Sequence, residues 1–231
     1  DKIKVIRGPK VLTLTPTTFG GVVDVERNEI TKVLHNKIYS TAGFFAETAN
    51  KGYLAAFTSE IPFNPFSIYL ETSTRDAGNI YTPKGYLKNS MSDNYNLAFG
   101  ISYINGNIIT GFSARKYSLN YGIPGGFIGA HPFGVNIELR RKQFNYKFIY
   151  NLNDKNKIDV DFSYSAYGHL EYEHNGLAGA EFKVADYIGK IEYKYENLFG
   201  INNGQLGIST DNRNFNVGGY VFTSPAKLTN I

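Results

Sequence analysis

Histidines and carboxylates crowd into one short stretch of this chain, His169-Leu170-Glu171-Tyr172-Glu173-His174. On an extended strand His169, Glu171 and Glu173 share a face, whereas His174 joins them only through a turn. Imidazole and carboxylate groups together suit zinc or a ferric complex. The alternative, which we favour, is that these side chains are the solvated rim of a long loop.

Glycine-rich sequence precedes another histidine, in Gly125-Gly126-Phe127-Ile128-Gly129-Ala130-His131. Such a loop either contacts a ligand or is an ordinary exposed loop, and the second is the more common case. His131, His169, Glu171 and His174 are therefore the candidate contacts for a substrate or a metal, and the identity of the metal stays open.

Two basic clusters are a further candidate. Arg115-Lys116 and Arg140-Arg141-Lys142 fall at the ends of expected strands, near loops. They would attract anionic chelates. The alternative that we favour is that they anchor the chain at the headgroup layer of a membrane.

Composition excludes several classes of function. The 231 residues carry 24 Lys and Arg against 20 Asp and Glu, and the basic residues are mostly scattered, which argues against a nucleic-acid partner. The absence of Cys excludes disulfides and thiolate metal sites. No nucleophile elbow, phosphate loop or metalloprotease helix occurs, so we expect neither an enzyme nor a bound cofactor.

Alternation of apolar and polar residues dominates from residue 33 onward, and this period of two predicts strands with two different faces. The apolar sides include Leu97, Phe99, Ile101 and Tyr103; Phe144, Tyr146, Phe148 and Tyr150; and Ile158, Val160, Phe162 and Tyr164. The opposite sides are small, polar or charged. No apolar stretch reaches the roughly 18 residues that a membrane-spanning helix needs.

The alternation predicts about nine strands, with a tenth beginning after residue 225. Their expected ranges are 33–46, 51–61, 65–76, 94–104, 108–121, 136–152, 157–170, 186–197 and 205–215. Short turns at 105–107, 153–156 and 198–204 alternate with long loops at 78–93, 122–135 and 171–185. Long strands, aromatic residues near their ends and alternating connection lengths are typical of an outer-membrane β-barrel, although a soluble sandwich would also alternate.

The first 25 residues have a different pattern. Two short strands, 2–6 and 22–25, flank a long turn that contains Gly8-Pro9 and Gly20-Gly21. About 30 residues are too few to bury a core of their own, so we expect this segment to belong to something larger. Because a charge held inside a polar barrel needs a partner, we expect Arg7 to bond either a wall carboxylate or backbone carbonyls. The carboxylates on inward positions are Asp159, Asp161, Glu192 and Glu196.

Arg7-Gly8-Pro9, ten intervening residues, Gly20-Gly21 and then Val22-Val23-Asp24-Val25 resemble the end of the plug domain of TonB-dependent outer-membrane receptors. The middle turn departs from that pattern, since Leu14-Thr15 stand where the family usually has Tyr-Gly. Tyr81-Thr82-Pro83-Lys84-Gly85 resembles the loop after the third barrel strand of the family, and Tyr121-Gly122-Ile123-Pro124-Gly125-Gly126 resembles the loop after the fifth.

The resemblance implies an all-β chain with two parts. Residues 1–30 would be the C-terminal part of a plug domain with Arg7, Gly8, Pro9, Gly20 and Gly21 as its motif. Residues 31–231 would be the N-terminal part of an antiparallel transmembrane β-barrel, with about nine or ten of its roughly 22 strands. We therefore expect the chain to be an internal fragment of a longer receptor.

The resemblance also implies a function. Such a receptor lies in the outer membrane of a Gram-negative bacterium, in contact with outer-membrane lipid. It binds a scarce substrate (an iron chelate, a metal or cobalamin) at extracellular loops and plug. It imports that substrate with energy from a TonB-type coupling complex, reached through an N-terminal segment that precedes residue 1.

Two other classes stay open at this point. A passive outer-membrane porin or adhesin-type barrel would share the strands but lack the plug motif. A soluble β-sandwich binding module would be extracted without detergent. The sequence leaves the identity of the substrate open under every one of these hypotheses.

Overall fold

The computed structural model describes residues 2–8, 11, 20–126, 131–198, 200–219 and 223–230. The predicted motif residue Pro9 lies outside this set. Apart from the 3-10 residue Val11, all the regular structure in the described residues is strand. No helix among them has the length and apolar character required to cross a membrane.

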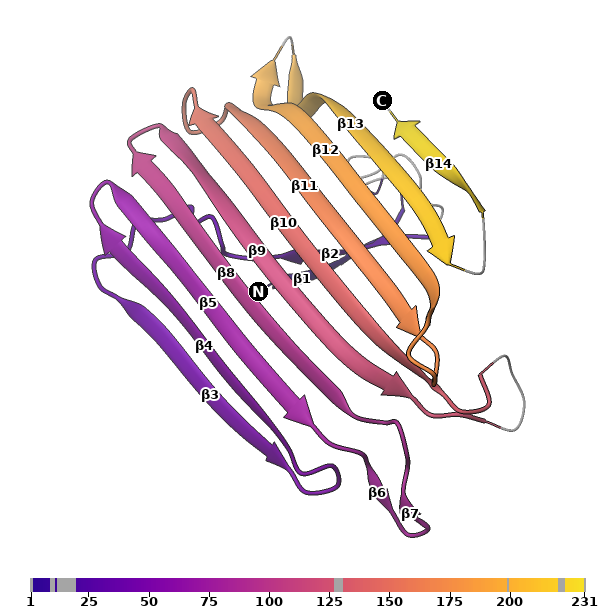
Figure 1. Ribbon diagram of the computed structural model, residues 1–231. Coiled ribbons are helices and arrows are strands. Elements are labelled where there is room, and N and C mark those ends of the chain that lie inside the picture. The colour runs from indigo at the N-terminus through magenta and orange to yellow at the C-terminus, as the bar shows by residue number, and fades with distance from the viewer. Residues whose placement is uncertain are drawn as a thin grey trace.

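Ten strands form one antiparallel sheet in which each strand pairs with its neighbours along the chain (Figure 1). The order is β14-β13-β12-β11-β10-β9-β8-β5-β4-β3. These strands are β3 (Tyr39–Glu47), β4 (Gly52–Phe63), β5 (Phe66–Ala77), β8 (Ser92–Asn105), β9 (Ile108–Ile123), β10 (Val135–Asn151), β11 (Lys157–Tyr172), β12 (Ala178–Leu198), β13 (Ile201–Gly219) and β14 (Thr223–Asn230). The predicted succession of long antiparallel strands is confirmed.

The sheet is open, because β3 and β14 each pair on one side only, and it does not close into a barrel. Two small hairpins accompany it: β1 (Lys2–Ile6) with β2 (Val22–Glu26), and β6 (Tyr81–Thr82) with β7 (Gly85–Tyr86). The two N-terminal strands expected around a long turn are thus present, with Ile6 opposite Val22.

Several predicted boundaries were wrong. The strand expected over 205–215 runs over Ile201–Gly219, and the expected loop 78–93 contains the β6–β7 hairpin. The first large strand begins at Tyr39 rather than at residue 33, because the preceding residues carry the chain from β2 to the sheet, where His35 Nε2 lies 3.4 Å from Glu60 Oε1. The expected loop 171–185 is short, since β12 already begins at Ala178. Pairing with β11 holds the small residues there in a strand, although their own β-propensity is low.

The register gives the sheet two chemically distinct faces. On one face a row of aromatic and apolar side chains crosses the strands, for example Phe112, Tyr146 and Phe162, which are directly opposite one another. On the other face the corresponding row is Ser113, Asn145 and Ser163. The predicted apolar faces of these strands are therefore confirmed, and they all lie on one side of the sheet.

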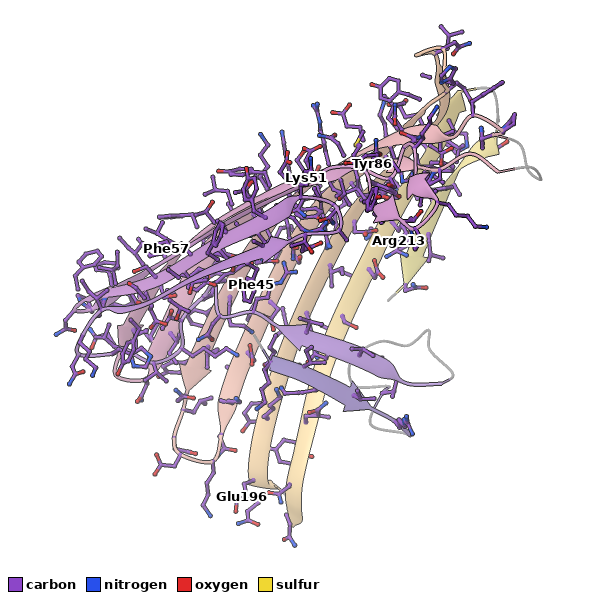
Figure 2. All side chains as sticks on the ribbon, turned by 90° about the horizontal axis from the view of Figure 1, so that it is seen from below. Phe45, Lys51, Phe57, Tyr86, Glu196 and Arg213 are labelled. Carbon is purple, nitrogen blue, oxygen red and sulfur yellow. The ribbon has the colours of Figure 1, made fainter. Side chains whose placement is uncertain are left out.

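The sheet is curved, and the β1–β2 hairpin lies on its inner side (Figure 2). The polar row belongs to this inner side, because Ser113, Asn145 and Ser163 line the space next to residues 24–32. We call the inner side the concave face and the apolar side the convex face. Phe45 and Phe57, labelled in Figure 2, point to opposite faces.

Aromatic rings mark both ends of the apolar band on the convex face. At the end with the short turns, Phe66 lies 5.4 Å from Phe63 and from Tyr103, measured between ring centroids. At the other end, Tyr164 lies 6.3 Å from Phe144 and 4.8 Å from Tyr187. The longer connections, which include β6–β7 and the segment before β10, extend from this second end (Figure 1).

Candidate functional site

The chain that follows β2 presses directly onto the concave face. Glu29, Ile30 and Thr31 are buried, with 5%, 8% and 2% of their surface exposed. They rest on strand positions that have almost no side chain. A Cβ atom at Gly100 would overlap the carbonyl oxygen of Glu29, and one at Gly111 would lie 2.7 Å from Cγ2 of Ile30. These two glycines make a seat for residues 29–31, which we call the docking segment.

Arg115 joins the docking segment to three strands of the sheet. Its Nε donates a hydrogen bond to Oε1 of Glu29 at 2.6 Å. Nη1 donates to Glu71 Oε1 at 2.7 Å and to Asn96 Oδ1 at 2.6 Å, and Nη2 donates to Glu71 Oε2 at 2.9 Å. Only 8% of the Arg115 side chain and 6% of the Glu29 side chain are exposed. A charge removed from water to this extent requires partners of this kind.

The network extends beyond Arg115. Tyr69 donates its hydroxyl proton to Glu71 at 2.7 Å, and the Asn96 amide donates to the same carboxylate at 2.7 Å. Glu71 therefore accepts hydrogen bonds from three side chains, which holds it ionised opposite Arg115. We call Arg115, Glu29, Glu71, Asn96 and Tyr69 the Arg115 network.

Further ion pairs tie the N-terminal segment together. Glu26 binds Lys4 across the hairpin at 2.7 Å and Lys32 of the following segment at 3.7 Å. The hydrogen bond from Lys4 lowers the pKa of the Glu26 carboxyl, and the same bond raises the pKa of Lys4. Both side chains are exposed, so these pairs orient the hairpin and add little stability.

Inward carboxylates of β11 and β12 pair with lysines of the sheet. Lys147 forms ion pairs with Asp161 and, at 3.2 Å, with Asp159. Glu192 forms ion pairs with Lys190 at 2.7 Å and Lys194 at 3.3 Å. These carboxylates lie on the concave face as predicted. In the part of the chain that the structure describes, none of them forms an ion pair with Arg7, so that expected pairing is not found.

A polar cavity of about 580 Å³ separates the N-terminal segment from strands β9–β12. Asp24, Glu26, Arg27 and Lys32 line one side of it, and Arg141, Lys147 and Asp161 line the other. Charges of both signs on both walls suit water and hydrophilic solutes rather than an apolar ligand.

The predicted histidine contacts lie at the end of the sheet that carries the longer connections. His169 and Glu171 share the concave face and approach to 3.2 Å between Nε2 and Oε1. Glu173 lies beyond the end of β11 and pairs with His131 at 3.1 Å, so it does not join them. His174 stacks on Phe133, with 5.3 Å between ring centroids.

These side chains form three separate pairs instead of one cluster. Across the described residues, no group of three or more His, Asp or Glu side chains is placed to hold a metal ion. Two of these contacts join the segment before β10 to the turn after β11. They are the pair of His131 with Glu173 and the stacking of Phe133 on His174.

The predicted plug motif lies around the β1–β2 hairpin. Gly8 and Gly21 both have positive φ, at 74° and 141°, which favours glycine. Gly20 adjoins Gly21, and a Cβ at Gly21 would come within 2.9 Å of the Ile6 carbonyl oxygen. Gly21 therefore permits the close approach of the chain before β2 to the end of β1, whereas a Cβ at Gly8 or Gly20 would meet no atom within 4 Å.

No protein-family model matches this chain, and no curated protein matches it. Function must therefore be argued from the arrangement of residues described above.

Sequence reasoning missed the Arg115 network. The sequence groups Arg115 with Lys116 as one basic cluster, yet adjacent strand residues point to opposite faces. Glu71, Asn96 and Arg115 lie on three different strands, and only the register brings them together. The one available signal was an Arg on the small, polar side of a strand, flanked by Ser113.

We expect the Arg115→Gln substitution to release the docking segment. It leaves the buried carboxylate of Glu29 and the half-buried carboxylate of Glu71 without their cation, which costs about 3 kcal/mol or more in unfolding free energy. Hydrogen exchange should accelerate across residues 27–32. The Arg75→Gln substitution is a matched control, because Arg75 binds Glu47 on the same sheet while 26% and 44% exposed and should cost under about 1 kcal/mol. Equal losses of unfolding free energy in the two variants would contradict the prediction that the Arg115 network holds the docking segment.

We expect the Gly100→Ala substitution to displace the docking segment without removing a charge. Its methyl group would occupy the position of the Glu29 carbonyl, and such overpacking costs about 1–3 kcal/mol. Gly189→Ala is the control, since its Cβ would meet only Thr210 Cγ2, at the ordinary distance of 3.4 Å. Limited proteolysis should cleave near residues 27–32 only in the Gly100 variant. If the Gly100→Ala variant resists cleavage there as the unchanged protein does, Gly100 is not required for docking of residues 29–31.

Proposed function

We propose that this chain is the N-terminal part of the wall of an outer-membrane active-transport receptor of the TonB-dependent type, together with the end of its plug. The substrate is a scarce solute such as an iron chelate, a metal or cobalamin. Residues 31–231 belong to the barrel wall, and residues 1–30 close the path inside it. Energy from a TonB-type complex would release that closure.

The observation that carries this proposal is the buried docking of the N-terminal segment on the concave face. An open aqueous pore does not require a segment that the bond between Arg115 and Glu29 holds against its polar wall. A polar concave face, an apolar convex face and aromatic rows at both ends of the apolar band supply the other properties of an outer-membrane barrel.

The open edges of the sheet fit the same proposal. Unpaired backbone groups on β3 and β14 are costly in lipid, and further strands would satisfy them. The polar cavity beside residues 24–32 then lies inside the barrel, next to the closure. The segments that carry His131 and His174, and the end of β11 that carries His169, lie at the end of the sheet with the longer connections, which in outer-membrane barrels faces outward.

A passive porin or an adhesin-type barrel is the alternative, favoured by the sheet alone. Uptake of a labelled ferric chelate or of labelled cobalamin by cells that carry the full-length protein separates the two classes. We expect accumulation against a gradient that stops when a protonophore collapses the proton gradient. Uptake that a protonophore leaves unchanged would favour the passive pore.

The membrane location has its own test. Ile191 lies on the convex face and is 52% exposed. We expect Ile191→Lys to lower the unfolding free energy of the full-length protein in lipid vesicles by about 2–3 kcal/mol, because a lysine would face the hydrocarbon. Ser209→Lys, one residue from the partner Ile208 but on the concave face, should cost far less. Equal costs, or extraction into buffer without detergent, would contradict a membrane barrel and favour a soluble sheet protein.

A further inference from the structure

Basic side chains gather at one border of the convex face. Lys116 lies opposite Lys142 on the neighbouring strands β9 and β10, and Arg140 lies two residues from Lys142 on the same face. Lys183 lies on β12, on the same row as Arg140, with Gly168 of β11 between them. All four basic residues are exposed. We call these four residues the basic border.

The basic border adjoins the apolar band without a gap. The next row along the strands, toward the short turns, holds Ala114, Phe144, Tyr164 and Tyr187. The rows after it hold Phe112, Tyr146 and Phe162, and then Phe148, Val160 and Ile191. Along β10 the convex face therefore changes directly from aromatic at Phe144 to cationic at Lys142, whereas on β11 and β12 small residues follow the aromatic row. The cationic side is the one nearer the longer connections.

Small residues open a cleft among these cations. Ala166, Gly168 and Ala185 form its floor, and Asn214 and Asn216 form its far side. Arg140, Lys142 and Lys183 line the cleft, which has a volume of about 360 Å³. The amides beside the cations can donate hydrogen bonds to an oxyanion that enters.

The charges of this cleft are only partly balanced. Arg140 forms an ion pair with Glu138, and Lys183 pairs with Glu181 at 2.7 Å. Both carboxylates lie one row farther from the apolar band. Lys116 and Lys142 have no hydrogen-bond or ion-pair partner among the described residues. Four cations against two carboxylates leave a net charge of about +2 beside an apolar surface, which favours an anion.

We propose that the basic border binds the phosphate group of an anionic membrane lipid, whose acyl chains lie along the aromatic rows below it. This inference rests on the proposed function, which places the convex face in a bilayer. A cation row directly above an apolar band matches the order of charge and hydrocarbon in such a lipid. A free phosphate ion would gain nothing from the aromatic rows, so the lipid is the occupant that uses both parts of the surface.

Native mass spectrometry of the full-length protein in detergent tests this assignment. The probes are a synthetic diphosphoryl glycolipid with several acyl chains, zwitterionic phosphatidylcholine and inorganic phosphate. We expect retention of the glycolipid alone. The combined substitution R140Q/K142Q/K183Q should weaken its binding on the order of a hundredfold, because each Lys or Arg near an anionic surface contributes roughly a factor of five. The variant K51Q/K84Q/K155Q is the control, since it removes three exposed cations outside the basic border.

Two results would overturn the assignment. Equal retention of inorganic phosphate would show an ion site in place of a lipid site, and equal retention of the glycolipid by both triple variants would place the lipid elsewhere. Membrane fractionation separates these failures from failure of the proposed function. A protein that fractionates with the outer membrane but does not retain the glycolipid refutes only the lipid site, whereas one that fractionates without membrane refutes both proposals.

Discussion

The buried guanidinium of Arg115 is the interaction on which the arrangement of this molecule depends. It bonds Glu29 of the docking segment, Glu71 of β5 and Asn96 of β8 at distances between 2.6 and 2.9 Å. A cation removed from water is stable only with such partners in place. Arg115 therefore links β5, β8 and β9 to the N-terminal segment through one set of side-chain hydrogen bonds.

The two faces of the sheet have different chemical properties. Ion pairs and small polar residues on the concave face hold a segment and border a polar cavity, while the convex face presents aromatic and aliphatic side chains that no element in the described residues covers. A soluble protein rarely leaves so large an apolar surface exposed. An outward apolar face and an inward polar face are the inverse of a soluble core, and this inversion underlies both the proposed barrel and the proposed lipid site.

Much of the sheet was predictable because strand alternation is a local property. Phe144, Tyr146, Phe148 and Tyr150 were expected on one face, and they all lie on the convex face. The boundaries were less predictable, since β12 takes in small residues near Gly179 that β11 holds by pairing. The histidine contacts illustrate the limit of spacing arguments. His169 and Glu171 do meet, but Glu173 pairs instead with His131, 42 positions earlier in the sequence.

The sequence by itself determined the succession of long strands, which side of each strand is apolar and where the N-terminal glycines stand, because all three depend on neighbours within a few residues. Only the tertiary structure decided that Glu29 meets Arg115, and that Arg140, Lys142 and Lys183 surround one cleft. Those contacts join different strands and depend on register, which shifts every pairing together when it changes. Long-range pairing of this kind leaves no pattern in one sequence.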